Sequence, residues 1–276
     1  MAWDDESFQK NLSLIMGGQW EEVGRPKYKD GKSVRVKRAL TIVNHYDLRR
    51  EFPLGSIRPV NLKGCFKEIL WIYQKRSVDT KELGLKIWDA WADENGRIPG
   101  CYGDMINRPV RTPDQTFDNQ TDFILWSLKN DKTSRRIMAS MFDPETNNVK
   151  PLQECAFQIN LSVKGDELYM TLYQRSLDMI TAGLWNVAQY AALMTMFAYD
   201  AGLKPAIFTH FVQDAHVYDR HEAQAMELIK RPLFFPIPQV TISERMTGKG
   251  FYDFTADDFE IRNYEPGKQV KFEVAV

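Results

Sequence analysis

Three side chains near the middle of the chain could together carry out nucleophilic chemistry. Cys155 and Arg175 lie at the ends of two apolar, β-branched and aromatic runs, residues 155–163 and 168–176, and Asn186 follows ten residues later. A cation beside a thiol lowers its pKa from about 8.5, so that thiolate becomes the working form. The alternative is a buried core cysteine, the commoner fate of a lone cysteine in a strand.

The turn between the two runs predicts how the thiol and the guanidinium meet. Residues 164–167 read Lys-Gly-Asp-Glu, and Gly165 can supply the positive φ that a two-residue hairpin turn needs. Pairing in register across that turn places Cys155 opposite Ser176, next to Arg175. The sequence therefore predicts a hairpin that brings a thiol and a cation to one end of a sheet.

Apolar periodicity predicts the elements that position these groups. Asn186 is expected to begin an almost wholly apolar helix, Val187 to Ala201, which Gly202 ends. The other expected elements are helices at 5–17, 64–74, 121–131 and 214–231, strands at 34–44 and 206–212, and a basic loop at 24–33. Together they predict an α/β (α+β) fold with a mixed central sheet flanked by helices. Because no repeat or linker divides the chain, residues 1–276 are expected to form a single domain.

Glu68 and two tryptophans are further candidates for a site. Glu68 stands among apolar residues of an expected helix, so it is either turned to solvent or held where desolvation raises its pKa. Trp88 and Trp91 share one helical face. They are either core packing or a platform for a flat ligand, because indole offers large contact area with little rotamer entropy.

Four residues could hold a sugar phosphate. Arg135 and Arg136 precede an apolar run and suit a dianion, since guanidinium groups bind phosphate in a bidentate way; surface charge is the alternative. His216 and Tyr218 could donate to a sugar hydroxyl, or could cap and pack a helix. No glycine-rich phosphate loop occurs in the sequence, so arginines would hold any phosphate.

Composition excludes several classes of protein. Lys and Arg number 36 and Asp and Glu 37, so a net charge of −1 gives no general attraction to nucleic acid or anionic membrane. No apolar run approaches the roughly 20 residues that span a bilayer, and no signal peptide is expected. His221 lacks the second histidine of a zinc protease motif because position 225 is Ala, so no metal is expected. Three separated cysteines favour the cytoplasm over a disulfide scaffold.

Several separated motifs, in order and at matching intervals, resemble the thymidylate synthase family. They are Glu68 in KEILW, IWDAWADENG (87–96), Tyr102-Gly103, Ser134-Arg135-Arg136, Cys155, Gln174-Arg175-Ser176-x-Asp178, Asn186, Asp214-x-His216-x-Tyr218 and the ending FYDFTADDFEIRNY…FEVAV. The resemblance extends from about Arg25 to Val276. It favours a nucleophilic role for Cys155 over the core alternative.

The resemblance implies methylation of dUMP at C5 through a covalent intermediate. Thiolate Cys155 would add to C6, so that C5 attacks the methylene group of 5,10-methylenetetrahydrofolate, which serves as carbon donor and reductant. Asn186 would pair with the O4/N3 edge of uracil, and Glu68 and Tyr102 would manage proton transfers. The other implied nucleotide contacts are Arg25, Arg135, Arg136 and Arg175 for the phosphate, Ser176 for the phosphate or base, His216 and Tyr218 for the ribose 3′-hydroxyl, and Gln174 and Asp178 as further contacts.

The resemblance also implies a folate site and a partner. Asp178 would bind the pterin, and the chain end at Val274–Val276 would close over the folate and exclude water. The other implied folate contacts are Trp88, Trp91 and Trp185, Ala275 and Val276, and Arg58 for the glutamate tail. The family pairs two subunits through the sheet face, so a homodimer is expected, in which Arg135 and Arg136 serve the partner's site.

The chain departs from the family pattern in four places. The usual Pro-Cys-His becomes Glu154-Cys155-Ala156, and Leu-Gly-Leu-Pro-Phe-Asn becomes Thr181-Ala-Gly-Leu-Trp185-Asn186. Val212-Gln213 replaces paired glycines, and the loop after Pro53 reads LGSIRP. The departure at 181–185 matters most, because that loop lines the side where the one-carbon unit meets hydride or water.

Two other functions compete with dUMP methylation. In the first, water captures the exocyclic methylene, which makes the enzyme a hydroxymethyltransferase on dUMP or dCMP. Related enzymes that act on dCMP carry aspartate at the position of Asn186, so Asn186 favours uracil without deciding between hydride and water. The second is a catalytically silent nucleotide-binding homodimer, which the loss of Cys155, Arg175 or Asn186 would favour. All three residues are present.

Overall fold

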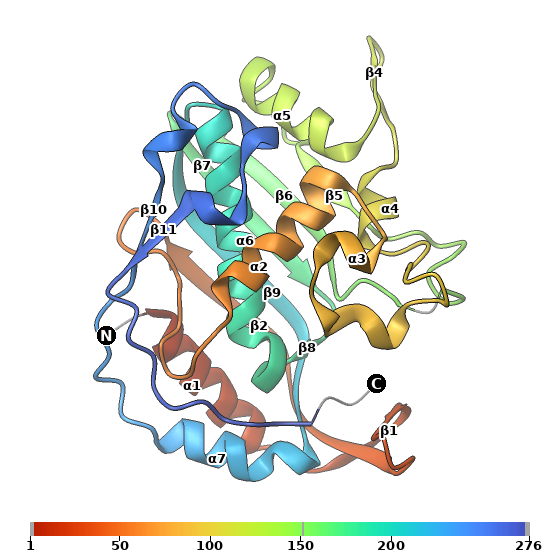
Figure 1. Ribbon diagram of the computed structural model, residues 1–276, viewed down its shortest axis with the longest axis vertical. Coiled ribbons are helices and arrows are strands. Elements are labelled where there is room, and N and C mark those ends of the chain that lie inside the picture. Colours follow the sequence, from red (N-terminus) through yellow and green to blue (C-terminus); the bar gives the residue numbers. More distant parts are fainter. Residues whose placement is uncertain (1–2, 151, 274–276) are drawn as a thin grey trace.

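One mixed sheet with helices packed on one of its faces forms the body of the protein (Figure 1). The computed structural model describes residues 3–150 and 152–273. The α-helices are α1 (Trp3–Met16), α2 (Leu62–Leu70), α3 (Thr80–Leu83), α4 (Tyr102–Ile106), α5 (Gln120–Asn130), α6 (Met179–Asp200) and α7 (Glu222–Lys230). The strands are β1 (Glu21–Lys27), β2 (Ser33–Asp47), β3 (Val110–Arg111), β4 (Thr116–Phe117), β5 (Met138–Ser140), β6 (Ala156–Lys164), β7 (Glu167–Gln174), β8 (Leu177–Asp178), β9 (Lys204–Tyr218), β10 (Gln239–Ile242) and β11 (Phe259–Arg262). Short helical turns are η1 (Trp71–Lys75, a π-helix), η2 (Lys86–Trp91), η3 (Asp219–His221), η4 (Glu244–Met246), η5 (Phe251–Asp253) and η6 (Ala256–Asp258).

The central sheet has the order β1-β2-β9-β7-β6-β5, with β8 beside β9. β9 is parallel to β7 and β8 and antiparallel to β2, so the sheet is mixed, as the sequence predicts. The expected strands at 34–44 and 206–212 and the hairpin β6–β7 are therefore confirmed. The hairpin turn is Gly165-Asp166, and Gly165 has a φ of 65°.

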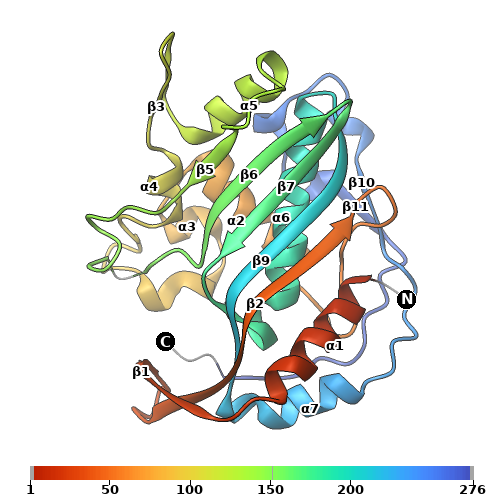
Figure 2. The same ribbon diagram turned by 180° about the vertical axis from the view of Figure 1, so that it is seen from behind.

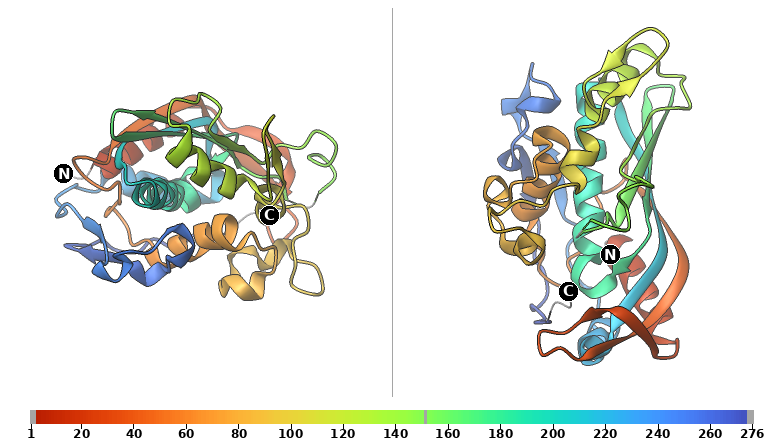
Figure 3. Two further views of the ribbon diagram at one scale, coloured as in Figure 1. Left: turned by 90° about the horizontal axis from the view of Figure 1, so that it is seen from above. Right: turned by 90° about the vertical axis from the view of Figure 1, so that its right-hand side faces the viewer.

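Helix α6 forms the layer between the sheet and the outer helices (Figure 3). Most of its residues are buried, because it packs on β9 on one side and on α2 on the other. A helix that is apolar all round must be covered all round. The core that results runs from Phe8 near one end of the chain to Val270 near the other.

The opposite face of the sheet is turned to the viewer in Figure 2, with no helix drawn over it among the described residues. Leu40 and Val43 are exposed there, and the rings of Tyr173 and Phe211 pair at 5.8 Å. Apolar side chains on an uncovered sheet face indicate a surface that another molecule covers.

The register at the start of the hairpin differs from the prediction. Lys164 pairs with Glu167 as expected, but a bulge lies between Ala156 and Gln158. The bulge shifts the pairing by one residue, so the Arg175 N–H donates to the carbonyl of Cys155 at 2.8 Å. Cys155 therefore lies opposite Arg175 and not opposite Ser176, because an extra residue in one strand offsets everything beyond it.

The start of the long apolar helix was also predicted wrongly. α6 begins at Met179, where the Asp178 carboxylate accepts from the backbone N–H groups of Ile180 and Thr181. An aspartate that satisfies these free donors is a strong N-cap. Asn186 consequently lies inside the helix and does not begin it.

Two boundary predictions fail where a long strand replaces a loop or a helix. Residues 214–218 belong to β9 and pair with β2 as far as Tyr218–Val36, and helix begins only at Asp219. Similarly, residues 24–27 of the expected basic loop belong to β1. Residues 214–218 are extended because β2, far away in the chain, pairs with them, whereas Lys27 pairs with Ser33 of the next strand, β2. The conformation of 214–218 therefore depends on a distant strand, which the local sequence does not show.

Candidate active site

A cavity of about 520 Å³ opens between the start of α6, helix α2, the turn η2 and the ends of β6 to β9. This volume suits a ligand of drug-like size. Thirteen of the residues predicted to form the site line it: Arg58, Glu68, Trp88, Trp91, Tyr102, Cys155, Gln174, Ser176, Asp178, Trp185, Asn186, His216 and Tyr218. The structure thus gathers residues that are up to 160 positions apart in the chain, Arg58 to Tyr218.

Cys155 is partly exposed and lines this cavity, and the Arg175 side chain lies against Cys155. Arg175 Nη2 is 3.7 Å from Cys155 Sγ, and the same guanidinium donates to the backbone carbonyls of Gln153 (3.0 Å) and Glu154 (3.1 Å). The Cys155 N–H donates to the Tyr102 hydroxyl at 2.9 Å. These bonds hold a cation beside the sulfur of the candidate nucleophile.

Glu68 is buried and held by two indole groups. Trp88 Nε1 donates to Oε1 at 2.8 Å, and Trp185 Nε1 donates to Oε2 at 2.5 Å. Burial raises the pKa of Glu68 from 4.5 to about 7, while the two indole hydrogen bonds act in the opposite direction. A carboxyl group with a pKa near neutrality can give or take a proton at working pH.

Asn186 is fixed by side chains on both sides. Its Oδ1 accepts from Gln174 Nε2 at 3.1 Å, and its Nδ2 donates to Gln189 Oε1 at 3.2 Å. Gln189 also lines the cavity, but it was not among the residues predicted from the sequence. Its position three residues after Asn186 places it on the same helical face, which is the signal that could have identified it.

His216 and Tyr218 enter the cavity from β9. They are two residues apart on one strand, so their side chains share a face of the sheet, with ring centroids 5.1 Å apart. His216 Nδ1 lies 3.7 Å from Asp214 Oδ1. Two polar rings therefore face the same ligand space, which a strand achieves as readily as the expected helix.

Arg58 lines the cavity but already has partners inside the protein. Its Nη2 donates to the carbonyls of Ile180 (2.6 Å) and Thr181 (3.3 Å), and its guanidinium lies 5.2 Å from the centroid of the Phe272 ring. Burial lowers its pKa. These contacts connect the C-terminal segment to the start of α6, and a contact with a glutamate tail stays a prediction.

Besides Arg175, which lies beside Cys155 without lining the cavity, five predicted residues are not placed in this cavity by the described part of the chain. Arg135 and Arg136 are exposed on the loop before β5. The Arg25 side chain and residues Ala275 and Val276 lie outside the part of the structure that is described. Their predicted roles stay untested.

Metal ligation and membrane insertion have no counterpart among the described residues. No group of three or more His, Cys, Asp or Glu within 3–150 and 152–273 could hold a metal ion. No helix in those ranges is long and apolar enough to cross a bilayer.

Comparison with known proteins identifies the family. A family model described as thymidylate synthase matches residues 7–276. The thymidylate synthase of Streptococcus pyogenes serotype M12 (strain MGAS2096) is 35% identical over 289 residues, which cover 100% of both chains. The chain belongs to the thymidylate synthase family. The thymidylate synthase of Streptococcus mutans serotype c is 34% identical with the same coverage.

A solved thymidylate synthase has the same fold. Thermostable thymidylate synthase A from Bacillus subtilis gives a TM-score of 0.91 with 31% sequence identity, and the match covers 99% of each chain. The mixed α/β architecture predicted from the sequence is therefore confirmed as the thymidylate synthase fold.

The tryptophan at 185, where the family usually has phenylalanine, is accommodated by a glycine on α2. A Cβ on Gly64 would lie 2.6 Å from Cη2 of Trp185, closer than any side chain tolerates. The space left by Gly64 lets the indole reach Glu68 and donate to it. Trp185 is thus, with Trp88, one of two indole donors to the buried carboxyl group.

Proposed function

We propose that this chain methylates dUMP at C5 to give dTMP, with 5,10-methylenetetrahydrofolate as co-substrate. The observation that carries the proposal is the Arg175 guanidinium 3.7 Å from Cys155 Sγ, at a cavity that Asn186 and Glu68 also line. A nucleophile, a ring-edge reader and a group titrating near neutrality are the parts that this reaction needs.

Cys155 would supply the nucleophile. Its thiolate adds to C6 of the pyrimidine, which makes C5 nucleophilic toward the one-carbon unit. The Cys155–C6 bond breaks again when the product leaves. Asn186 binds the O4/N3 edge, while Glu68 and Tyr102 hold and move protons on the base. The methylenetetrahydrofolate provides the carbon and the hydride.

The remaining side chains would bind and orient the two substrates. Arg175, Arg25 and, from a second copy of the chain, Arg135 and Arg136 bind the phosphate. His216 and Tyr218 bind the ribose, and Gln174 and Ser176 support the nucleotide. Trp88, Trp91 and Trp185 form the wall for the folate ring system, Asp178 contacts the pterin, Arg58 reaches the glutamate tail, and Ala275 and Val276 close the site.

The proposal includes a homodimer, one domain over residues 1–276 and a cytoplasmic location. The apolar sheet face with Leu40, Val43 and Phe211 supports the homodimer, because it has no cover within the described part of one chain. The family match over residues 7–276 supports one domain. Bacterial relatives and the separated cysteines support the cytoplasm.

Product analysis tests the proposal directly. Purified protein with dUMP and methylenetetrahydrofolate is expected to give dTMP by mass spectrometry and dihydrofolate by absorbance. Cys155→Ala is expected to fold and to lose turnover. Hydroxymethyl-dUMP with tetrahydrofolate would assign the water-capture reaction instead, and the absence of any product would favour a silent nucleotide-binding protein.

A further inference from the structure

A buried histidine lies behind the residues that face the nucleotide. His210 on β9 is 1% exposed, and its Nε2 is 2.8 Å from Gln174 Oε1. Burial lowers the pKa of His210 to about 4, so the ring is neutral near neutral pH and one of its two nitrogens carries a hydrogen. Which nitrogen carries it depends on Gln174.

A backbone carbonyl fixes the orientation of the Gln174 amide. Gln174 Nε2 donates to the carbonyl of Ser176 at 3.1 Å, and a carbonyl can only accept. The amide oxygen of Gln174 is therefore the atom that faces His210. It follows that His210 Nε2 is the protonated nitrogen and donates.

The same amide then orients Asn186. Gln174 Nε2 also donates to Asn186 Oδ1 at 3.1 Å, which leaves Asn186 Nδ2 to donate to Gln189 Oε1 at 3.2 Å. The hydrogen bonds run in one direction from His210 through Gln174 to Asn186 and Gln189. Turning over any one amide would place two acceptors or two donors face to face.

The direction matters because an asparagine can read two bases. Uracil offers an acceptor at C4 beside a donor at N3, whereas cytosine offers a donor at C4 beside an acceptor at N3. An amide that is free to turn over can match either edge, and an amide that is held matches one. Discrimination therefore requires a group that holds the amide.

We propose that His210 is a positioning residue that sets base specificity: through Gln174 it holds the Asn186 amide in one orientation and so separates uracil from cytosine nucleotides. The proposal rests on the proposed function for the identity of the preferred base. His210 does not line the cavity of the site, so it acts only through Gln174.

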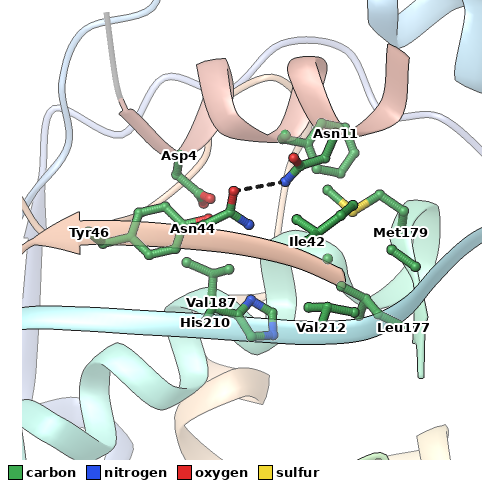
Figure 4. A pocket seen from close by; sticks show the side chains of 13 residues that line it. Asp4, Asn11, Ile42, Asn44, Tyr46, Leu177, Met179, Val187, His210 and Val212 are labelled. Atoms are coloured by element: carbon green, nitrogen blue, oxygen red, sulfur yellow. Dashed lines mark hydrogen bonds between the residues drawn. The ribbon is translucent and has the colours of Figure 1, made fainter. Parts of the chain in front are cut away.

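A small cavity lies beside His210 on the face of the sheet that the helices cover. His210 lines a space of about 10 Å³ between α1, β2 and α6, with Asp4, Asn11 and Asn44 among its polar walls (Figure 4). Asn11 donates to Asn44 across it at 3.1 Å. A space of this size is at the lower limit of what a single water molecule needs.

Binding measurements on three variants test the proposal. Dissociation constants for dUMP and dCMP are measured by calorimetry, without folate, for the natural chain, His210→Phe, His210→Gln and Phe208→Leu. His210→Phe removes the donor and is expected to reduce the preference for dUMP roughly tenfold, the effect of about one neutral hydrogen bond. His210→Gln can still donate and is expected to keep most of the preference.

Phe208→Leu is the matched control for packing. Phe208 is buried and stacks on His210 with ring centroids 6.1 Å apart, but it takes no part in the hydrogen bonds. This variant is expected to lower stability and to leave the dUMP-to-dCMP ratio unchanged. If it changed the ratio as much as His210→Phe, packing would explain the effect and the proposal would be overturned.

The outcomes separate this proposal from the proposed function. A natural chain that prefers dCMP, or binds neither nucleotide, contradicts the proposed function and removes the basis of this inference. A natural chain that prefers dUMP, with a folded His210→Phe of equal preference, overturns the role of His210 alone. If His210→Phe does not fold, His210→Leu replaces it in the same comparison.

Discussion

Glu68 shows how two neighbouring indoles and burial set the state of a single side chain. Desolvation favours the neutral acid and the Trp88 and Trp185 donors favour the carboxylate, with the balance at a pKa of about 7. A group that changes charge near neutrality can take up and return a proton within one turnover. The indole donors therefore compensate only part of the cost of burying the carboxylate, and this leaves the group able to exchange a proton near neutral pH.

The raised pKa of Glu68 predicts a pH-dependent stability. Between its ordinary value of 4.5 and about 7, the folded chain keeps a proton that the unfolded chain has released. Stability therefore falls as pH rises through that window, by about 3 kcal/mol in total. Glu68→Gln removes this dependence. The free energy of unfolding of the variant, relative to that of the natural chain, is therefore expected to rise by about that amount between roughly pH 5 and pH 8.

Urea unfolding at the two pH values measures the difference. The variant should also lose the corresponding ionisation from the pH profile of kcat/KM. An equal stability difference at both pH values would mean that Glu68 has an ordinary pKa in the folded chain.

At the scale of the element, the loop between β5 and β6 places the nucleophile with a buried ion pair. Lys150 and Glu154 are 4% and 1% exposed and are bonded to each other, and Lys150 Nζ also donates to the Gly100 carbonyl at 3.2 Å. Glu154 precedes Cys155, and Gly100 lies two residues before Tyr102. The pair thus connects the segments that carry two site residues.

Breaking this pair on one side is expected to be costly. Lys150→Met leaves a buried carboxylate without its cation and should lower the free energy of unfolding by about 3–5 kcal/mol. Replacing both residues, by Lys150→Met with Glu154→Leu, should recover most of that loss, because an apolar pair needs no compensation. A thermodynamic cycle from denaturant unfolding measures the coupling. Strictly additive losses would show that the two charges do not depend on each other.

The sequence could predict an element where neighbouring residues decide its conformation, and could not where residues far away in the chain decide it. The β6–β7 hairpin follows from Gly165 and the alternation around it, so its turn was predicted correctly. The bulge next to Cys155 could not be predicted, because contacts of Arg175 with the preceding loop accompany it. Likewise, β9 continues to Tyr218 because β2, some 180 residues earlier, pairs with it.

The same distinction holds for the site. Cys155, Arg175 and Asn186 could be predicted because their residue types and intervals match a known family. His210 could not, because its role consists of a contact with Gln174, 36 residues away on another strand. Lys150 could not, because only the surrounding fold buries its pair with Glu154. Gln189 lies between these cases, since helical spacing from Asn186 would have pointed to it.

At the scale of the whole molecule, the uncovered sheet face predicts a dimer. Val43 is 46% exposed on that face, whereas Phe234, 89% exposed, lies on the segment between α7 and β10. Val43→Asp places a charge where a second copy would pack, so the variant is expected to sediment as a single chain. It should also lose activity, because Arg135 and Arg136 then serve no partner.

Phe234→Asp is the control for this prediction. It adds the same charge at an exposed apolar residue away from the sheet face, and it should leave the sedimentation of the natural protein unchanged. Dimers of unchanged stability in Val43→Asp would show that the sheet face is not the interface.

The central claim is that the Cys155 sulfur bonds to C6 of a bound pyrimidine nucleotide, and trapping that bond tests it most directly. In a 5-fluorinated dUMP, fluorine replaces the C5 proton that must be lost before the folate can leave, so incubation with methylenetetrahydrofolate should leave nucleotide and folate attached to the protein. Mass spectrometry of the digested protein is expected to find both on the peptide that contains Cys155, and none in Cys155→Ala. An unmodified Cys155 peptide under these conditions, or an adduct on another residue, would contradict the account.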